Sequence, residues 1–171
     1  MNYLFRHLFL FAFFAFLPLL LVASAASLTA HSGNRVYYTI EPQSDSTLLV
    51  RVTLHEHDLA GLLAREQACA PSQDLTICAV ELIRQKMSVT INGTLTPMIP
   101  SGSSTTSHDV VLLYVLRAAP SHIRTMTIEN TCFVTTTPKL ENILNLALRE
   151  DVMYSLTKDR TSITHTFKAA P

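Results

Sequence analysis

The sequence predicts a mainly β protein, an antiparallel β-sandwich of immunoglobulin-like type with one or two inserted helices. Short segments of alternating apolar and polar residues recur along the chain, and turn residues separate them. These segments predict about eight strands. Threonine is frequent in them, as on solvated strand faces. Two segments with helical spacing follow the second strand and interrupt the order of a plain immunoglobulin domain.

Residues 1–25 have the features of an export signal. A short basic region precedes an apolar run over residues 8–22, and small residues follow at positions 23–25. The alternative is an uncleaved anchor, but the apolar run is shorter than the roughly 20 residues of a membrane span. Cleavage after Ala25 predicts a single soluble domain, residues 26–171, in the periplasm or outside the cell, with no membrane span after signal cleavage.

Charge and cysteine content narrow the class of protein. Lysine and arginine together number 13, as do aspartate and glutamate, so neither a nucleic-acid surface nor an acidic tail is indicated. The chain has three cysteines, Cys69, Cys78 and Cys132. Cys69 and Cys78 are close in sequence, and an oxidising compartment favours a disulfide between them. The alternative is a pair of buried thiols, since cysteine is often buried. No CxxC motif indicates a redox-active pair.

The first strands form a predicted antiparallel hairpin. Residues 36–40 alternate, and a turn-rich stretch leads to the clearer alternation of residues 47–55. One face of the second strand is apolar; it carries Leu48, Val50, Val52 and Leu54.

Two helices are predicted next. Asp58 can cap a short helix with Leu59, Leu62 and Leu63 on one side, although it contains a glycine. Ser72 or Asp74 can cap a second helix over residues 75–87, which should pack on a sheet. Its apolar residues recur at helical spacing and are Leu75, Cys78, Ala79 and Leu82.

Strand patterns return after the second helix. Asn92-Gly93 predicts a two-residue hairpin turn. Residues 101–109 are interpreted as a polar loop, and residues 110–116, apolar on both faces, as a central strand. The next strand places Cys132 on a face with Met126, Ile128 and Asn130.

The last segments are short and alternate in polarity. Residues 143–148 fit either a strand or a helix, and residues 152–157 and 162–167 predict two final strands. His165 alternates with Ile163 and Phe167, which favours a core histidine with its hydrogen bonds satisfied.

Two histidines flank Glu56 and raise the question of a metal site. Residues two apart in a strand share a face, so His55 and His57 could bind one ion. A third ligand would come from elsewhere, for example His31, His108 or Asp109. The alternative is the solvated end of a strand, because Arg51 and Thr53 share the face of His55 and an arginine disfavours a nearby cation. We favour the solvated strand end.

The motifs of common enzymes and cofactors are not found in the sequence. It contains no nucleophile elbow, no P-loop and no dinucleotide fingerprint, so neither a catalytic residue nor a cofactor is expected. Asn92-Gly93-Thr94 matches a glycosylation acceptor, but the hairpin turn explains the same residues.

The order of segments resembles a known family. An exported chain with a strand pair, then "DLAGLL", a helix, "VTINGTLTP", "VVLLYVL", "TIEN", "ENILNLAL" and "SITHTF" is similar to the uncharacterised exported bacterial family called domain of unknown function 6702. It resembles, more distantly, the extracytoplasmic N-terminal domain of hydrogenase/urease accessory permeases linked to nickel. The resemblance implies a β-sandwich and a strand at residues 143–148. It implies no catalytic residues.

Two functions follow as expectations. The first is a non-enzymatic exported binding or accessory domain, whose ligand and partner are unknown and whose partner could be an envelope protein or a transporter. The second is a periplasmic metal-binding protein for nickel, copper or zinc that uses His55 and His57.

Overall fold

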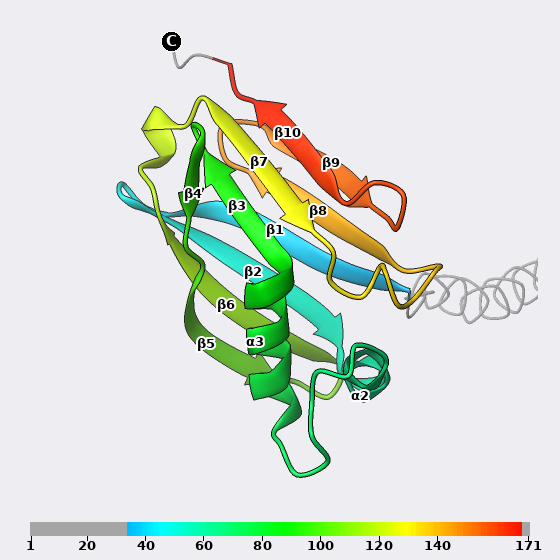
Figure 1. Ribbon diagram of the computed structural model, residues 1–171. Coiled ribbons are helices and arrows are strands. Elements are labelled where there is room, and N and C mark those ends of the chain that lie inside the picture. The colour runs from blue at the N-terminus through cyan, green and yellow to red at the C-terminus, as the bar shows by residue number, and fades with distance from the viewer. Residues whose placement is uncertain (1–33, 169–171) are drawn as a thin grey trace, which may run out of the picture. The chain divides into compact units, whose positions relative to one another are not determined.

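The protein is a sandwich of two β-sheets. The computed structural model describes residues 34–168, which lie within one compact unit (Figure 1). The first sheet has six strands in the order β5-β6-β2-β1-β8-β9, and the second has four in the order β10-β7-β3-β4. The apolar faces of both sheets contribute to one buried core. The predicted mainly β sandwich is confirmed; the predicted signal at residues 1–25 and His31 lie outside the described residues.

The described residues form ten strands, two more than the sequence predicts. The strands are β1 (Arg35–Ser44), β2 (Thr47–His55), β3 (Met87–Ile91), β4 (Thr94–Thr96), β5 (Ile99–Thr105), β6 (Asp109–Arg117), β7 (Thr125–Asn130), β8 (Glu141–Ala147), β9 (Asp151–Leu156) and β10 (Ser162–Thr166). The helices among these residues are α2 (Glu56–Arg65), α3 (Leu75–Lys86) and the short 3-10 helix η1 (Pro120–His122).

Strands β1 and β2 form the predicted antiparallel hairpin, with Tyr38 opposite Val52. Alternate residues of both strands are buried, as the pattern predicts. On its other side β1 pairs in parallel with β8, so the first described strand lies inside the sheet. Residues 143–148, ambiguous in sequence, therefore belong mostly to a strand, β8.

Helix α2 begins earlier than predicted. His55 precedes its first turn and makes no side-chain capping bond, so the prediction that Asp58 caps this helix is wrong. Asp58 instead lies in the first turn, where a negative charge stabilises the amino end of a helix. The buried face carries Leu59, Leu62 and Leu63, as predicted.

Helix α3 matches its prediction closely. The Asp74 carboxylate accepts hydrogen bonds from the main-chain N–H groups of Thr76 (2.7 Å) and Ile77 (3.2 Å), which confirms the cap. Of the apolar residues at helical spacing, Cys78, Ala79 and Leu82 are buried, whereas Leu75, the first residue of the helix, is 40% exposed. The helix leads directly into β3 (Figure 1). It contacts the six-stranded sheet, where the Tyr114 hydroxyl donates a hydrogen bond to the Val80 carbonyl.

The polar loop predicted at residues 101–109 is confined to residues 106–108, and the prediction is wrong for residues 101–105. Residues Ile99–Thr105 form strand β5, which pairs antiparallel with β6 through a bulge after Pro100. All seven residues are exposed, so the strand has no apolar face that could produce an alternating pattern. Main-chain pairing with β6 alone defines it. Strand β6 is paired on both sides, as predicted for a central strand.

Strand β7 ends at Asn130, two residues before Cys132. Met126, Ile128 and Asn130 are buried as predicted, but Cys132 lies in the turn after the strand, where it is fully buried. Strands β9 and β10 are edge strands of different sheets. Within residues 34–168, we find no helix that combines the length and apolar character needed to cross a membrane.

Candidate functional site

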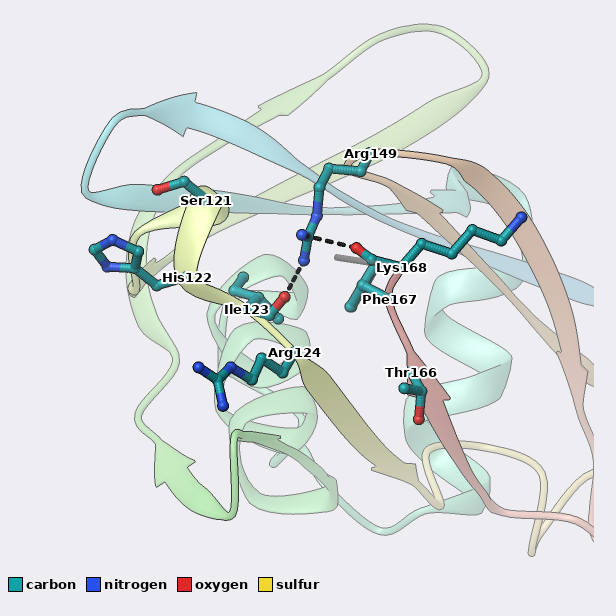
Figure 2. Close-up of a pocket in the computed structure, with 8 residues that line it drawn as sticks. All are labelled: Ser121, His122, Ile123, Arg124, Arg149, Thr166, Phe167 and Lys168. Carbon is teal, nitrogen blue, oxygen red and sulfur yellow. Dashed lines mark hydrogen bonds between the residues drawn. The ribbon is translucent and has the colours of Figure 1, made fainter. Parts of the chain in front are cut away.

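A pocket of about 490 Å³ opens where three separate segments meet (Figure 2). The first segment joins η1 to β7, the second is the turn between β8 and β9, and the third is the end of β10. We call this the basic pocket. It is lined by Ser121, His122, Ile123, Arg124, Arg149, Thr166, Phe167 and Lys168.

Arg149 reaches across the pocket from the β8–β9 turn. Its guanidinium donates hydrogen bonds to the carbonyl oxygens of Ile123 and, at 3.0 Å, of Lys168 (Figure 2). Its central carbon also lies 5.3 Å from the centre of the Phe167 ring, which adds a cation–π contact. Arg149 therefore joins the turn of one sheet to two strands of the other, and its charge is held in a defined place.

The charge in the basic pocket is not balanced locally. Arg124, Arg149 and Lys168 carry fixed positive charges, and the lining contains no acidic residue. The acid next to Arg149 in sequence, Glu150, directs its carboxylate to His165, whose Nε2 atom lies 2.9 Å from the Glu150 Oε1 atom. Three cations around one hollow produce a local positive potential, although the 13 lysines and arginines of the whole chain balance its 13 aspartates and glutamates.

Asn92 does not line the basic pocket, but its side chain is hydrogen-bonded to the main chain of residues 122–125, which form one wall of the pocket. Its amide nitrogen donates to the His122 carbonyl at 2.9 Å, and its amide oxygen accepts from the N–H groups of Arg124 (2.7 Å) and Thr125 (3.0 Å). Asn92 has a φ of 51° and Gly93 one of 81°, which confirms the hairpin turn. Since both ends of the Asn92 amide are bonded, a glycan on this nitrogen would break the clamp, and the turn explains the motif.

A second polar cluster lies beside the basic pocket. His165 on β10 is bonded to the Tyr154 hydroxyl on β9 at 2.7 Å and to the Glu150 carboxylate at 2.9 Å. Its ring also packs edge-on against Phe167 at 4.4 Å. The hydrogen bonds of His165 are satisfied, as predicted, but the prediction of a core position is wrong, because the residue is only partly buried between two edge strands. The cluster ties the edge strands of the two sheets together, since each of its bonds joins a residue of β10 to the β8–β9 turn or to β9.

The structure separates the environments of His55 and His57. His55 is the last residue of β2 and pairs with Asp109 of β6, whereas His57 is the second residue of α2. The two-residue period of a strand therefore does not place both rings on one face, and that premise is wrong. His57 lines a hollow with Asn34. Asn34 precedes β1, which lies on the side of β2 opposite to β6 and its Asp109.

The residues suggested as a third metal ligand are close in the fold. Asp109 lies opposite His55, and the His108 carbonyl accepts a hydrogen bond from the Glu56 N–H at 2.9 Å. In the described part of the chain, however, no three His, Cys, Asp or Glu side chains are grouped so that they could hold a metal ion.

The cysteines have structural environments. Cys69 and Cys78 form a disulfide between the α2–α3 connection and α3. Cys132 is a free, buried thiol, and burial raises its pKa to about 12. Its main chain is bonded to Asn130 and Asn142, which fixes the turn after β7.

Sequence reasoning missed the basic pocket. Its cations are scattered as Arg124, Arg149 and Lys168, with no shared motif or spacing. Only the pairing of β7 with β10 and the position of the β8–β9 turn bring them together. The one usable signal in the sequence was Asn92-Gly93. The pattern predicted a hairpin turn there, but it did not indicate that the Asn92 side chain bonds the pocket wall.

Comparison with protein-family models and with curated proteins finds no match to this chain. The family resemblance drawn from short sequence motifs therefore stays a hypothesis.

Proposed function

We propose that this protein is a non-enzymatic exported binding domain that holds an anionic group in the basic pocket. The observation that carries the proposal is that Arg124, Arg149 and Lys168 line one hollow without an acidic lining residue. The Arg149 guanidinium lies between the segments that form the hollow, and the charged ends of Arg124 and Lys168 point away from it on different sides (Figure 2). Segments distant in sequence supply these cations, so the charge is produced by the fold and not by a basic run.

Arg149 is the central donor in this proposal. Its two bonds to carbonyl oxygens use two of the five N–H groups of a guanidinium, and the others can bind an anion. Those bonds also orient the side chain before a ligand arrives, which lowers the entropic cost of binding. Ile123 and Phe167 give the pocket an apolar part, so it suits an anionic group attached to an apolar one.

The groups whose pKa values are raised by burial lie outside the basic pocket. Burial raises the pKa of Tyr38, Tyr114 and Cys132, and all three lie in the core and not in the basic pocket. Desolvation of packed core side chains accounts for such shifts without an active site.

Calorimetric titration of residues 26–171 with inorganic phosphate and with benzoate, at low salt, tests the proposal. We expect saturable binding at millimolar concentration or tighter. Arg124→Gln and Lys168→Gln should each weaken binding about two- to fivefold, as expected for removing one exposed charge. Lys158→Gln removes an equal charge from the β9–β10 turn and should have no effect. The proposal would be overturned if neither phosphate nor benzoate showed saturable binding, or if the affinity fell equally in all three variants.

The exported location rests on the sequence of residues 1–25. The intact mass of protein recovered from outside the cytoplasm should correspond to a chain that begins near Ala26. Retention of residues 1–25 in a membrane fraction would contradict this part of the proposal.

The second candidate function is metal binding by His55 and His57, and the position of Asp109 opposite His55 is the observation that favours it. Calorimetry with nickel, copper and zinc separates the two functions. Stoichiometric submicromolar binding that disappears in a His55→Ala/His57→Ala variant would place the metal function first.

A further inference from the structure

Strand β5 is an open edge of the six-stranded sheet. It pairs with β6 on one side, and in the described part of the chain no strand covers its other side. All seven of its residues are exposed, including those that point toward the core side of the sheet. An uncovered strand edge presents main-chain N–H and C=O groups that can pair with another chain.

The other three edges are less available. Strand β4 has only three residues, and β9 and β10 contact each other across the two sheets. Natural edges are commonly protected by charged side chains, especially lysine. Strand β5 has Pro100 and a bulge near one end, but Gly102, Ser103, Ser104 and Thr105 follow without a charge or a bulky side chain.

We propose that β5 pairs antiparallel with β5 of a second copy of this chain. The absence of charge from Ile99 to Thr105 is the reason to choose a second copy, because like charges opposite each other destabilise a strand pair. Pairing centred on Ser103 sets only serine, glycine and threonine side chains against each other near the axis. The contact is two-fold and closed, and it joins two six-stranded sheets into one.

A row of apolar side chains across β2, β6 and β5 ends at this edge and would be covered by a strand paired with β5. Ile99 is 41% exposed and lies opposite Val115, which in turn lies opposite Leu49. Gly102 lies opposite Leu113 and offers it no side chain as cover. A strand placed on β5 therefore shields apolar surface as well as main-chain groups. The inference does not depend on the basic pocket.

Sedimentation equilibrium of residues 26–171 over a range of concentrations tests the pairing. We expect a dimer that dissociates on dilution. Ser103→Lys places two like charges at the two-fold axis and should weaken the dimer about fivefold, which corresponds to about 1 kcal/mol for a cross-strand charge pair. Ser155→Lys, on the exposed face of β9, is the matched control and should not change the dimer.

A charge exchange makes the test specific. An equimolar mixture of Ser103→Lys and Ser103→Glu chains should form the dimer at least as well as the unchanged chain, because opposite charges then meet at the axis. Far-ultraviolet circular dichroism checks that each variant is folded. A monomer at every concentration, a dimer that Ser103→Lys leaves intact, or no rescue in the mixture would overturn the proposal.

Discussion

Replacing Asn92 should loosen the wall of the basic pocket and lower the free energy of unfolding of the domain. Three side-chain hydrogen bonds, of 2.9, 2.7 and 3.0 Å, join the Asn92 amide to the main chain of residues 122–125. Each bond of this kind contributes about 0.5–1.5 kcal/mol. Asn92 is exposed, so the low end of this range applies, and the three together amount to about 1.5–2.5 kcal/mol.

Three substitutions at Asn92 separate the hydrogen bonds from the backbone conformation. Asn92→Gly loses the three bonds but tolerates the φ of 51°. Asn92→Ala loses the bonds and adds about 1 kcal/mol for a left-handed residue with a side chain. Asn92→Asp keeps the two acceptor bonds, so its free energy of unfolding should lie between those of the unchanged protein and Asn92→Gly.

Urea unfolding followed by far-ultraviolet circular dichroism measures these differences. The slope of the free energy against urea should stay constant, so that midpoints report stability directly. The titration with phosphate should weaken in Asn92→Gly, because Arg124 is no longer held by the turn. A free energy of unfolding for Asn92→Gly within about 0.5 kcal/mol of the unchanged protein would refute this reasoning, since that is the range of ordinary surface substitutions.

Three further predictions concern the core and the disulfide. Tyr114→Phe should lower the free energy of unfolding by about 1 kcal/mol, because the hydrogen bond from the Tyr114 hydroxyl to the Val80 carbonyl of α3 is lost. Tyr38→Phe should leave the free energy of unfolding unchanged or raise it, because the Tyr38 hydroxyl is buried without a hydrogen-bond partner in the described residues. An equal decrease of the free energy of unfolding in both variants, measured by urea unfolding, would contradict this prediction. Cys69→Ala/Cys78→Ala should cost about 2–3 kcal/mol, as expected for opening a loop with a sequence separation of 9, and thermal unfolding of the oxidised and reduced protein checks it. Burial raises the Cys132 pKa from 9.0 to about 12, so the unfolded chain loses this proton at a lower pH than the folded chain, and stability should fall as the pH rises from about 9 toward about 12. Burial also raises the pKa of Tyr38 and Tyr114, so the stability of Cys132→Ala should fall as well, but less steeply than that of the unchanged protein, and equal slopes would contradict the assignment.

The fold was predictable where one face of an element is buried. Leu48, Val50, Val52 and Leu54 alternate because β2 has one core face, and helix α3 was recognisable from the Asp74 cap and its apolar spacing. Strand β5 was not predictable, because both of its faces are exposed. Its main-chain hydrogen bonds to β6 do not depend on side-chain type and so produce no pattern in the sequence.

The candidate site was not predictable for a related reason. His55 and His57 are two residues apart and would share a face in a regular strand, yet the strand ends between them. Arg124 and Arg149 are 25 positions apart in the numbering, and only the tertiary pairing of strands brings them to one hollow. Sequence patterns report local periodicity, whereas a pocket between turns depends on the arrangement of whole strands.

The parallel pairing of β1 with β8 has a consequence for how the chain acquires its structure. Arg35 and Glu141 are 106 positions apart, yet they are neighbours in the ladder and form an ion pair. Until β8 has been synthesised and docked, the β1–β2 hairpin has one long unpaired side, and closing so large a loop slows folding. A chain that completes its central sheet only after β8 has been added stays unfolded for longer, and a pulse-labelling experiment on amide hydrogens should show late protection of β1 and β8 together.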